Sequence, residues 1–153
     1  MGPEYLPATG NAEQELVLLH GWGSNREVWR PLLAQLRPWA NVTLLDLPGC
    51  APGLATADDY QLEDLLRQVL AAAPQRAVYL GWSLGGQVAI ELAARHASRV
   101  AAVVTVCSNP CFVAHASWPG MDSATLAGFR SACGADPVAA LRRFGSLQVQ
   151  GAL

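Results

Sequence analysis

AVYLGWSLGG, at residues 77–86, carries the strongest structural signal in the chain. The apolar run 77–80 is typical of a buried strand, and the residues after Gly86 favour a helix that continues to about His96. Between strand and helix stands a Gly-x-Ser-x-Gly motif, whose glycines let the two elements approach closely while the turn holds its serine strained and outward. The motif predicts a nucleophilic role for Ser83. The alternative is a glycine-rich turn whose serine has no catalytic role.

Further apolar runs extend this pattern in both directions along the chain. Strands are predicted at 15–19, 42–45 and 100–106, and helices over 27–36 and 62–70. Asp58 or Asp59 is the predicted N-cap of the second helix. Strands that are apolar throughout and alternate with helices indicate an α/β fold, with a mostly parallel sheet covered by helices on both faces.

The last third of the chain has a different pattern. Residues 108–119 contain no periodic segment, and two helical patterns follow, over 123–132 and from Asp136-Pro137 onward. Because no strand separates these helices, they need not belong to the sheet layer. We therefore expect a core at 1–107 and, at 108–153, a connection with part of a helical cap.

Composition excludes several classes of protein. Hydrophobic residues make up 52% of the 153 residues and charged residues 14%, which favours a packed domain over a disordered chain. No apolar run approaches the roughly 20 residues of a membrane span, and the first ten residues do not resemble a signal peptide. The net charge of −2 says little by itself. We expect a cytoplasmic protein that binds neither membrane nor nucleic acid.

The cysteines do not form a metal-binding pattern. Their positions are Cys50, Cys107, Cys111 and Cys133, with no C-x-x-C pair among them. We interpret them as reduced thiols and expect no metal site.

A second glycine-rich segment follows the first predicted strand and reads His20-Gly21-Trp22-Gly23. A serine that cleaves esters needs two backbone N–H donors for the oxyanion of the tetrahedral intermediate. One comes from the residue after the nucleophile, here Leu84, and the other from a loop after an earlier strand, here Trp22. His20 is either a general base or a support for this loop, and its position before the loop favours support.

Five motifs in order carry a family resemblance: HGWG (20–23), DLPG (46–49), GWSLGG (81–86), VTVCSNPCF (104–112) and SWPGM (117–121). In this order they resemble the BioH family, the pimeloyl-acyl carrier protein methyl ester esterases of biotin biosynthesis. The resemblance runs from about Leu16 to the end of the chain. It implies an α/β-hydrolase fold with a helical cap, a carboxylesterase reaction that releases methanol, and no cofactor.

The same resemblance implies roles for particular residues. Ser83 matches the nucleophile, and Trp22 and Leu84 match the oxyanion donors. The implied substrate-binding residues are Trp22, Trp82, Leu84, Phe144, Gly145, Ser146, Leu147 and Gln148. Arg143, with Arg142 beside it, would face the acyl carrier protein that bears the pimeloyl methyl ester. The alternatives are an ordinary cap core for Phe144 and Leu147 and a solvated surface for the two arginines.

The acid and base of a catalytic triad are not evident in these residues. In this fold the order is Ser, then Asp or Glu, then His, and Asp122 and Asp136 have the pattern of helix caps. The resemblance implies that acid and base lie beyond residue 153, in a C-terminal part of the fold that is absent here; the complete protein would be a monomer. Two alternatives stay open: an incompetent remnant or carrier-binding fragment, and another small-ester hydrolase or lactonase.

Overall fold

The computed structural model describes residues 2–48 and 60–150 of the chain. The chain forms two compact units, Met1–Pro110 and Cys111–Leu153, which are described separately. Asp58 and Asp59, the predicted helix caps, lie outside the described residues.

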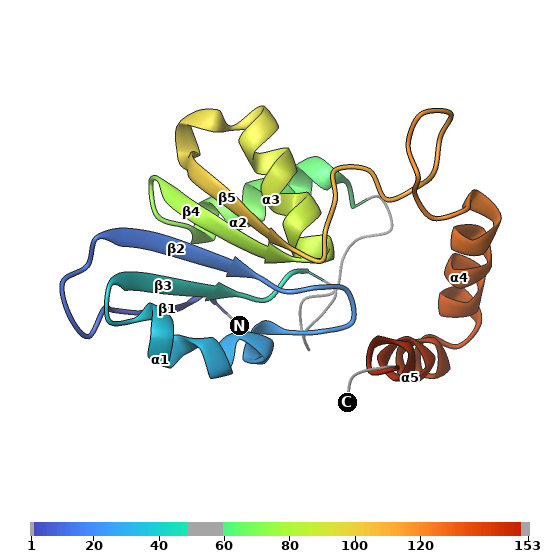
Figure 1. Ribbon diagram of the computed structural model, residues 1–153, viewed down its shortest axis with the longest axis horizontal. Helices are drawn as coiled ribbons and strands as arrows, with labels where there is room; N and C mark the ends of the chain where they lie inside the picture. Colours follow the sequence, from blue (N-terminus) through green and yellow to red (C-terminus); the bar gives the residue numbers. More distant parts are fainter. Residues whose placement is uncertain (1, 49–59, 151–153) are drawn as a thin grey trace. The chain divides into compact units, whose positions relative to one another are not determined.

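A five-stranded sheet forms the centre of the first unit (Figure 1). Its strands are β1 Glu4–Leu6, β2 Gln14–Leu19, β3 Ala40–Leu45, β4 Ala77–Trp82 and β5 Val100–Val106. They lie in the order β1-β3-β2-β4-β5, and every pairing is parallel except β1 with β3. The predicted mostly parallel sheet is confirmed, and the sequence analysis missed only the three-residue strand β1.

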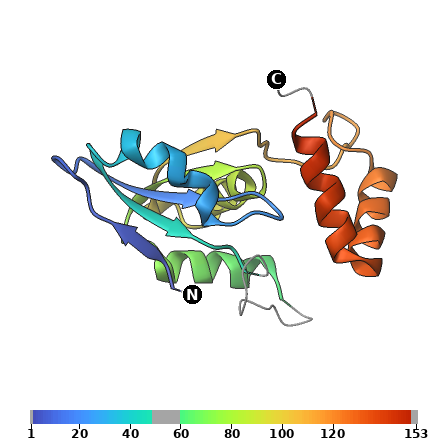
Figure 2. The same ribbon diagram turned by 90° about the horizontal axis from the view of Figure 1, so that it is seen from below.

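Helices cover both faces of this sheet (Figure 2). On one face lie η1 Arg26–Leu32 and α1 Leu33–Leu36, and on the other α2 Leu62–Ala72 and α3 Leu84–Arg95, which is followed by the short η2 Ala97–Arg99. The helix expected over 27–36 is present, but most of it is a 3-10 helix with Pro31 inside it, and only Leu33–Leu36 are α-helical. Proline lacks the N–H that an α-helical ladder needs.

Helix α2 begins with a reciprocal cap. The side chain of Gln61 accepts a hydrogen bond from the backbone N–H of Asp64, and the Asp64 carboxylate accepts one from the Gln61 N–H. Two N–H groups that the helix leaves without partners are thereby satisfied. Within the described residues, the N-cap is therefore a glutamine that lies past the predicted aspartates.

Successive side chains of a strand point to opposite faces of the sheet, so the hydrophobic core has two parts, one on each face. Leu16 and Leu18 of β2 pack with Trp29 of η1, whereas Val17 and Leu19 pack with the apolar sides of α2 and α3. All four β2 side chains are at most 5% exposed. Burial on both faces explains why residues 16–19 of this central strand are all apolar, whereas Gln14 and Glu15 at its start are at least partly exposed.

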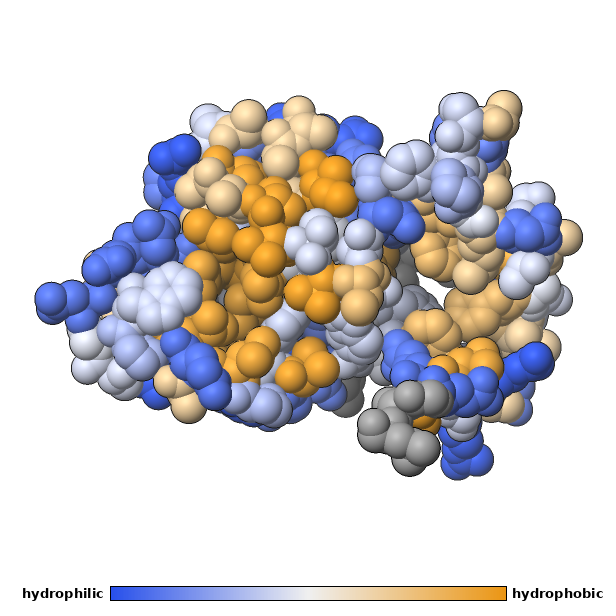
Figure 3. Space-filling model, in the orientation of Figure 1, coloured by the Kyte–Doolittle hydropathy of each residue, from blue (hydrophilic) through white to orange (hydrophobic). Residues whose placement is uncertain are grey.

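Strand β5 forms one edge of the described sheet and exposes apolar surface. Val104 and Val106 are 44% and 40% exposed, and they pair with Leu80 and Trp82 of β4. Figure 3 shows apolar side chains gathered over this part of the sheet. An apolar edge strand of seven residues without a charge or proline is a template for pairing with another strand.

The second unit consists of an irregular segment and two helices. Isolated bridges join Val113 to Met121 and His115 to Trp118. Helices α4 Ser123–Ala135 and α5 Pro137–Gln148 are capped by the carboxylates of Asp122 and Asp136, as their sequences predict. Neither these nor any other helix in the described residues has the length and apolarity needed to cross a bilayer.

Candidate active site

Ser83 stands at the turn where β4 ends and α3 begins. Its backbone has φ 52° and ψ −116°, in the left-handed half of conformational space that residues with a Cβ rarely adopt. The Ser83 N–H donates to Val106 O at 2.9 Å, and the Ser108 hydroxyl donates to Ser83 O at 2.7 Å. The predicted strand–turn–helix geometry is therefore present. The two hydrogen bonds, to β5 and from the residue Ser108 that follows it, hold the strained backbone of Ser83 in place.

Two glycines of the motif allow this turn because backbone atoms occupy the space that a side chain would need. A Cβ on Gly85 would lie 2.6 Å from the Leu19 carbonyl carbon and 2.7 Å from His20 O. A Cβ on Gly81 would meet the backbone of Gly85 and Gly86 at still shorter range. Helix α3 therefore begins directly against the end of β2, and its first N–H groups, starting at Leu84, have no partner within the helix.

The loop after β2 lies directly beside Ser83. A Cβ on Gly21 would be 3.3 Å from the Ser83 Cβ and 3.0 Å from the ring of Trp82. Trp22 is the next residue, and Gly23 turns the chain with φ 68°. The first unit thus brings together the loop of Trp22, the ring of Trp82 and the start of α3 at Leu84, as the oxyanion hypothesis requires.

His20 is fully buried, and both of its ring nitrogens are engaged. Nδ1 donates to Gly21 O at 2.8 Å, and Nε2 accepts from the Leu47 N–H at 2.9 Å. This pattern requires the neutral imidazole with its proton on Nδ1. Desolvation lowers the pKa of His20 and outweighs the opposing effects of the Gly21 carbonyl and of Asp46. The geometry favours the predicted loop support over a role as general base.

Neither His20 nor His96 can activate Ser83 from where it lies. The ring of His20 is occupied, and His96 follows the last residue of α3, roughly 18 Å from Ser83 at about 1.5 Å per residue. His96 lies 3.7 Å from Glu63 instead. The third described histidine, His115, belongs to the second unit.

The predicted acyl-channel and carrier residues all lie on α5 of the second unit. The Phe144 ring packs against Phe129 with centroids 6.0 Å apart, so part of the predicted channel wall contributes to the contact between α4 and α5. Leu147 is 53% exposed. Also exposed are Gly145, Ser146, Gln148, Arg142 and Arg143.

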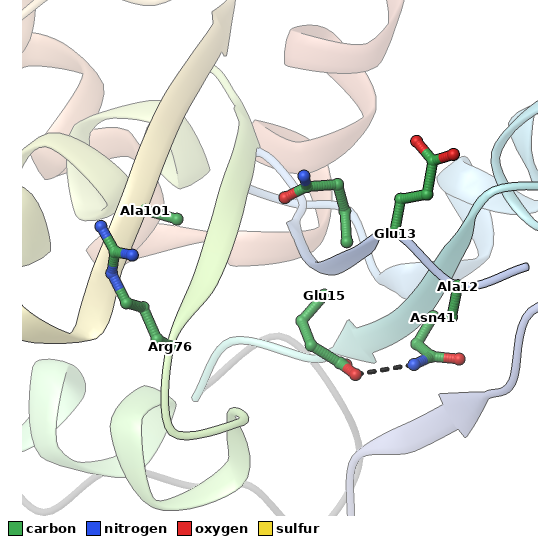
Figure 4. Close-up of a pocket in the computed structure, with 7 residues that line it drawn as sticks. Ala12, Glu13, Glu15, Asn41, Arg76 and Ala101 are labelled. Atoms are coloured by element: carbon green, nitrogen blue, oxygen red, sulfur yellow. Dashed lines mark hydrogen bonds between the residues drawn. The ribbon is translucent and has the colours of Figure 1, made fainter.

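A separate hollow of about 290 Å³ lies at the other end of the strands from Ser83, where the strands begin (Figure 4). It is lined by the starts of strands, with Glu15 accepting a hydrogen bond from Asn41 at 2.7 Å and Arg76 on the other side. Ligands of α/β sheets bind at the carboxyl ends of strands, where Ser83 lies. No cluster of three or more metal-ligating side chains occurs in the part of the chain that the structure describes.

Comparison with known proteins gives three kinds of match. The family model of the alpha/beta hydrolase fold matches residues 15–152. The chain is 46% identical over 144 residues to a pimeloyl-[acyl-carrier protein] methyl ester esterase of Edwardsiella ictaluri, covering 94% of this chain and 55% of the relative. It is 42% identical to the enzyme of the same name from Yersinia enterocolitica, covering 96% and 57%. The chain thus spans about half the length of the curated relatives it matches.

Solved structures agree on the fold. An esterase from Exiguobacterium antarcticum superposes with a TM-score of 0.78 at 22% identity, covering 94% of this chain and 55% of the other. The enol-lactonase of Burkholderia xenovorans superposes with a TM-score of 0.57 at 30% identity, covering 66% and 41%.

Proposed function

The chain belongs to the alpha/beta hydrolase family, and we propose that it is the nucleophile-bearing part of a serine carboxylesterase. The proposed substrate is the methyl ester of a pimeloyl group on acyl carrier protein, which would place the reaction in biotin biosynthesis. Two relatives at 42–46% identity that are named for this substrate support the assignment. The observation that carries it is the strained turn at Ser83, with the Gly21–Trp22 loop beside it.

The proposed chemistry is acyl transfer in two steps. Ser83 Oγ attacks the ester carbonyl carbon and gives its proton to a general base, while the backbone N–H groups of Trp22 and Leu84 bind the oxyanion. The intermediate collapses to an acyl-enzyme as the base returns the proton and methanol leaves. Water then attacks the acyl-enzyme in the same way and releases the free carboxylate. Within the first unit neither His20 nor His96 can serve Ser83. From the resemblance to the esterase family, we propose that the base is a histidine outside the described residues.

The remaining roles concern binding. Trp82, beside Ser83, would contact the acyl group. On α5, the channel would be lined by Phe144, Gly145, Ser146, Leu147 and Gln148. Arg142 and Arg143 are exposed on the same helix and could pair with an acidic carrier. They point about 100° apart, so the two side chains would not serve one contact equally.

A chimaera tests the proposal. This chain would be joined to the part of the Edwardsiella ictaluri relative that follows the matched region, and methanol release from pimeloyl-acyl carrier protein methyl ester would be measured. We expect turnover that Ser83→Ala reduces about 10⁶-fold, as loss of a triad nucleophile does in a well-studied serine protease. A folded chimaera whose hydrolysis survives Ser83→Ala would overturn the assignment.

Two other functions have specific support. Within the first unit neither His20 nor His96 can act as a base for Ser83, which favours a carrier-binding fragment without activity. The enol-lactonase match at 30% identity favours a different small ester or lactone. A fluorophosphonate probe that fails to label Ser83 of the folded chimaera would support the first. Faster turnover of p-nitrophenyl acetate or an enol-lactone than of the carrier ester would support the second.

A further inference from the structure

We propose that Asp46 is a positioning residue which, with the adjacent Leu47, clamps both ends of the loop that carries the Trp22 N–H. The inference rests on the proposed function, since it assigns the clamp's purpose to the oxyanion donor. The clamp itself is a set of contacts within the first unit.

The near end of the loop is held through His20. Its Nε2 accepts the Leu47 N–H at 2.9 Å, and its Nδ1 donates to Gly21 O at 2.8 Å, so the ring bridges the chain after β3 to the first residue of the loop. Because the ring is fully buried, these bonds do not compete with water.

The far end of the loop is held by Asp46. Its Oδ1 accepts the backbone N–H of Arg26 at 2.8 Å, and its Oδ2 lies 3.2 Å from Arg26 Nε. The two side chains are only 6% and 12% exposed, which limits screening by solvent. Two consecutive residues after β3 therefore fix positions 20 and 26, and only five residues, 21–25, lie between them.

A second layer of contacts braces the arginine. Arg26 Nη1 donates to Gly2 O at 3.0 Å, and its Nε lies 3.9 Å from the Glu4 carboxylate. Glu4 in turn binds Arg30 through two bonds of 2.7 Å. The guanidinium of Arg26 is thus held between Asp46 and the β1 end of the chain, which limits the orientations that Asp46 can adopt.

The functional consequence concerns the transition state. An oxyanion donor is effective only when its N–H already points to the place where the negative charge develops. A loop that is pinned at both ends loses little freedom when that charge appears. Releasing one end should therefore lower kcat while leaving KM nearly unchanged, because the ground-state ester does not depend on this donor.

The first experiment needs no catalysis. Amide hydrogen exchange of residues 21–25 would be compared in this chain, in Asp46→Ala and in Asp46→Asn, which keeps an acceptor for the Arg26 N–H. The control is Arg95→Gln, which removes an exposed charge from the same unit; Arg95 pairs with Glu91 of α3 and makes no contact with Asp46, Arg26 or Glu4. We expect exchange about 10-fold faster or more in Asp46→Ala, an intermediate change in Asp46→Asn, and none in the control.

The second experiment uses the active chimaera. Asp46→Ala should lower kcat by about 10- to 100-fold, less than the roughly 10²–10³ of losing a donor outright, with KM within about 2-fold and with Arg95→Gln unchanged. Wild-type exchange at residues 21–25 in folded Asp46→Ala, or in Asp46→Asn if the alanine variant does not fold, would overturn the clamp. If the chimaera with Asp46 intact were inactive while Asp46→Ala still speeded exchange at residues 21–25, the proposed function would be refuted and the clamp would stand.

Discussion

Replacing Gly85 with alanine tests the packing that places Ser83 at its turn. The new Cβ would lie 2.6 Å from the Leu19 carbonyl carbon and 2.7 Å from His20 O, on the buried backbone where the central strand β2 ends. Ordinary contact begins near 3.4 Å, so strand and helix must separate by several tenths of an ångström. Overpacking of this kind costs about 3 kcal/mol, and the helix propensity of alanine returns about 1. We expect a net loss of about 2 kcal/mol.

Gly128→Ala is the matched control. Gly128 is also inside an α-helix, α4, and nothing lies within 4 Å of the position where its Cβ would stand. The same substitution should therefore stabilise its own unit by about 0.5–1 kcal/mol.

Native-state hydrogen exchange separates the two effects, because amides of β2 report on the first unit and amides of α4 on the second. Gly85→Ala should speed exchange in β2 by about 30-fold, the equivalent of 2 kcal/mol. If Gly85→Ala slowed that exchange, or if both variants changed their units alike, α3 would not be packed against β2 as described.

Four further changes have expected outcomes. Arg99 donates to three backbone carbonyls at and after the end of α2, at 2.6–3.1 Å, so Arg99→Ala should lower the free energy of unfolding by about 1–3 kcal/mol in urea titrations; a loss below 0.5 would contradict this. Ser83→Gly should raise that free energy by about 1–2 kcal/mol, since glycine adopts φ 52° without strain, and an unchanged urea midpoint would argue against strain. Burial lowers the pKa of His20, so below pH 6.5 the unfolded chain takes up a proton before the folded one does and stability should fall as the pH decreases. Urea midpoints at pH 7.5 and 5.5 check this. In His20→Gln the midpoint should fall less between the two pH values, because the contribution of His20 is removed. Val104→Lys should reduce self-association through the exposed β5 edge, seen as a smaller sedimentation coefficient at high concentration; equal association in both proteins would place the contact elsewhere.

Elements whose signals are local were predictable from the sequence. The run 77–86 specifies a strand, a turn that needs glycine and a helix start within ten residues, and Asp136-Pro137 specifies a cap and a first turn. The family motifs likewise predicted roles for Ser83 and Trp22, and these stay predictions that the chimaera tests. The apolar spacing over 27–36 also predicted a helix, but it did not show that residues 26–32, with Pro31 among them, would form a 3-10 helix.

The sequence by itself determined the strands β2 to β5 and the turn at Ser83, because each depends on neighbours a few positions away. Only the tertiary structure decided that Asp46 and Leu47 hold the loop of Trp22. That contact exists because β2 and β3 pair in parallel with Leu19 opposite Leu45, which brings residues 20 and 46 side by side at the same edge of the sheet. Strand register across twenty-six positions leaves no mark in a local pattern, since it is fixed by the burial of both strands together.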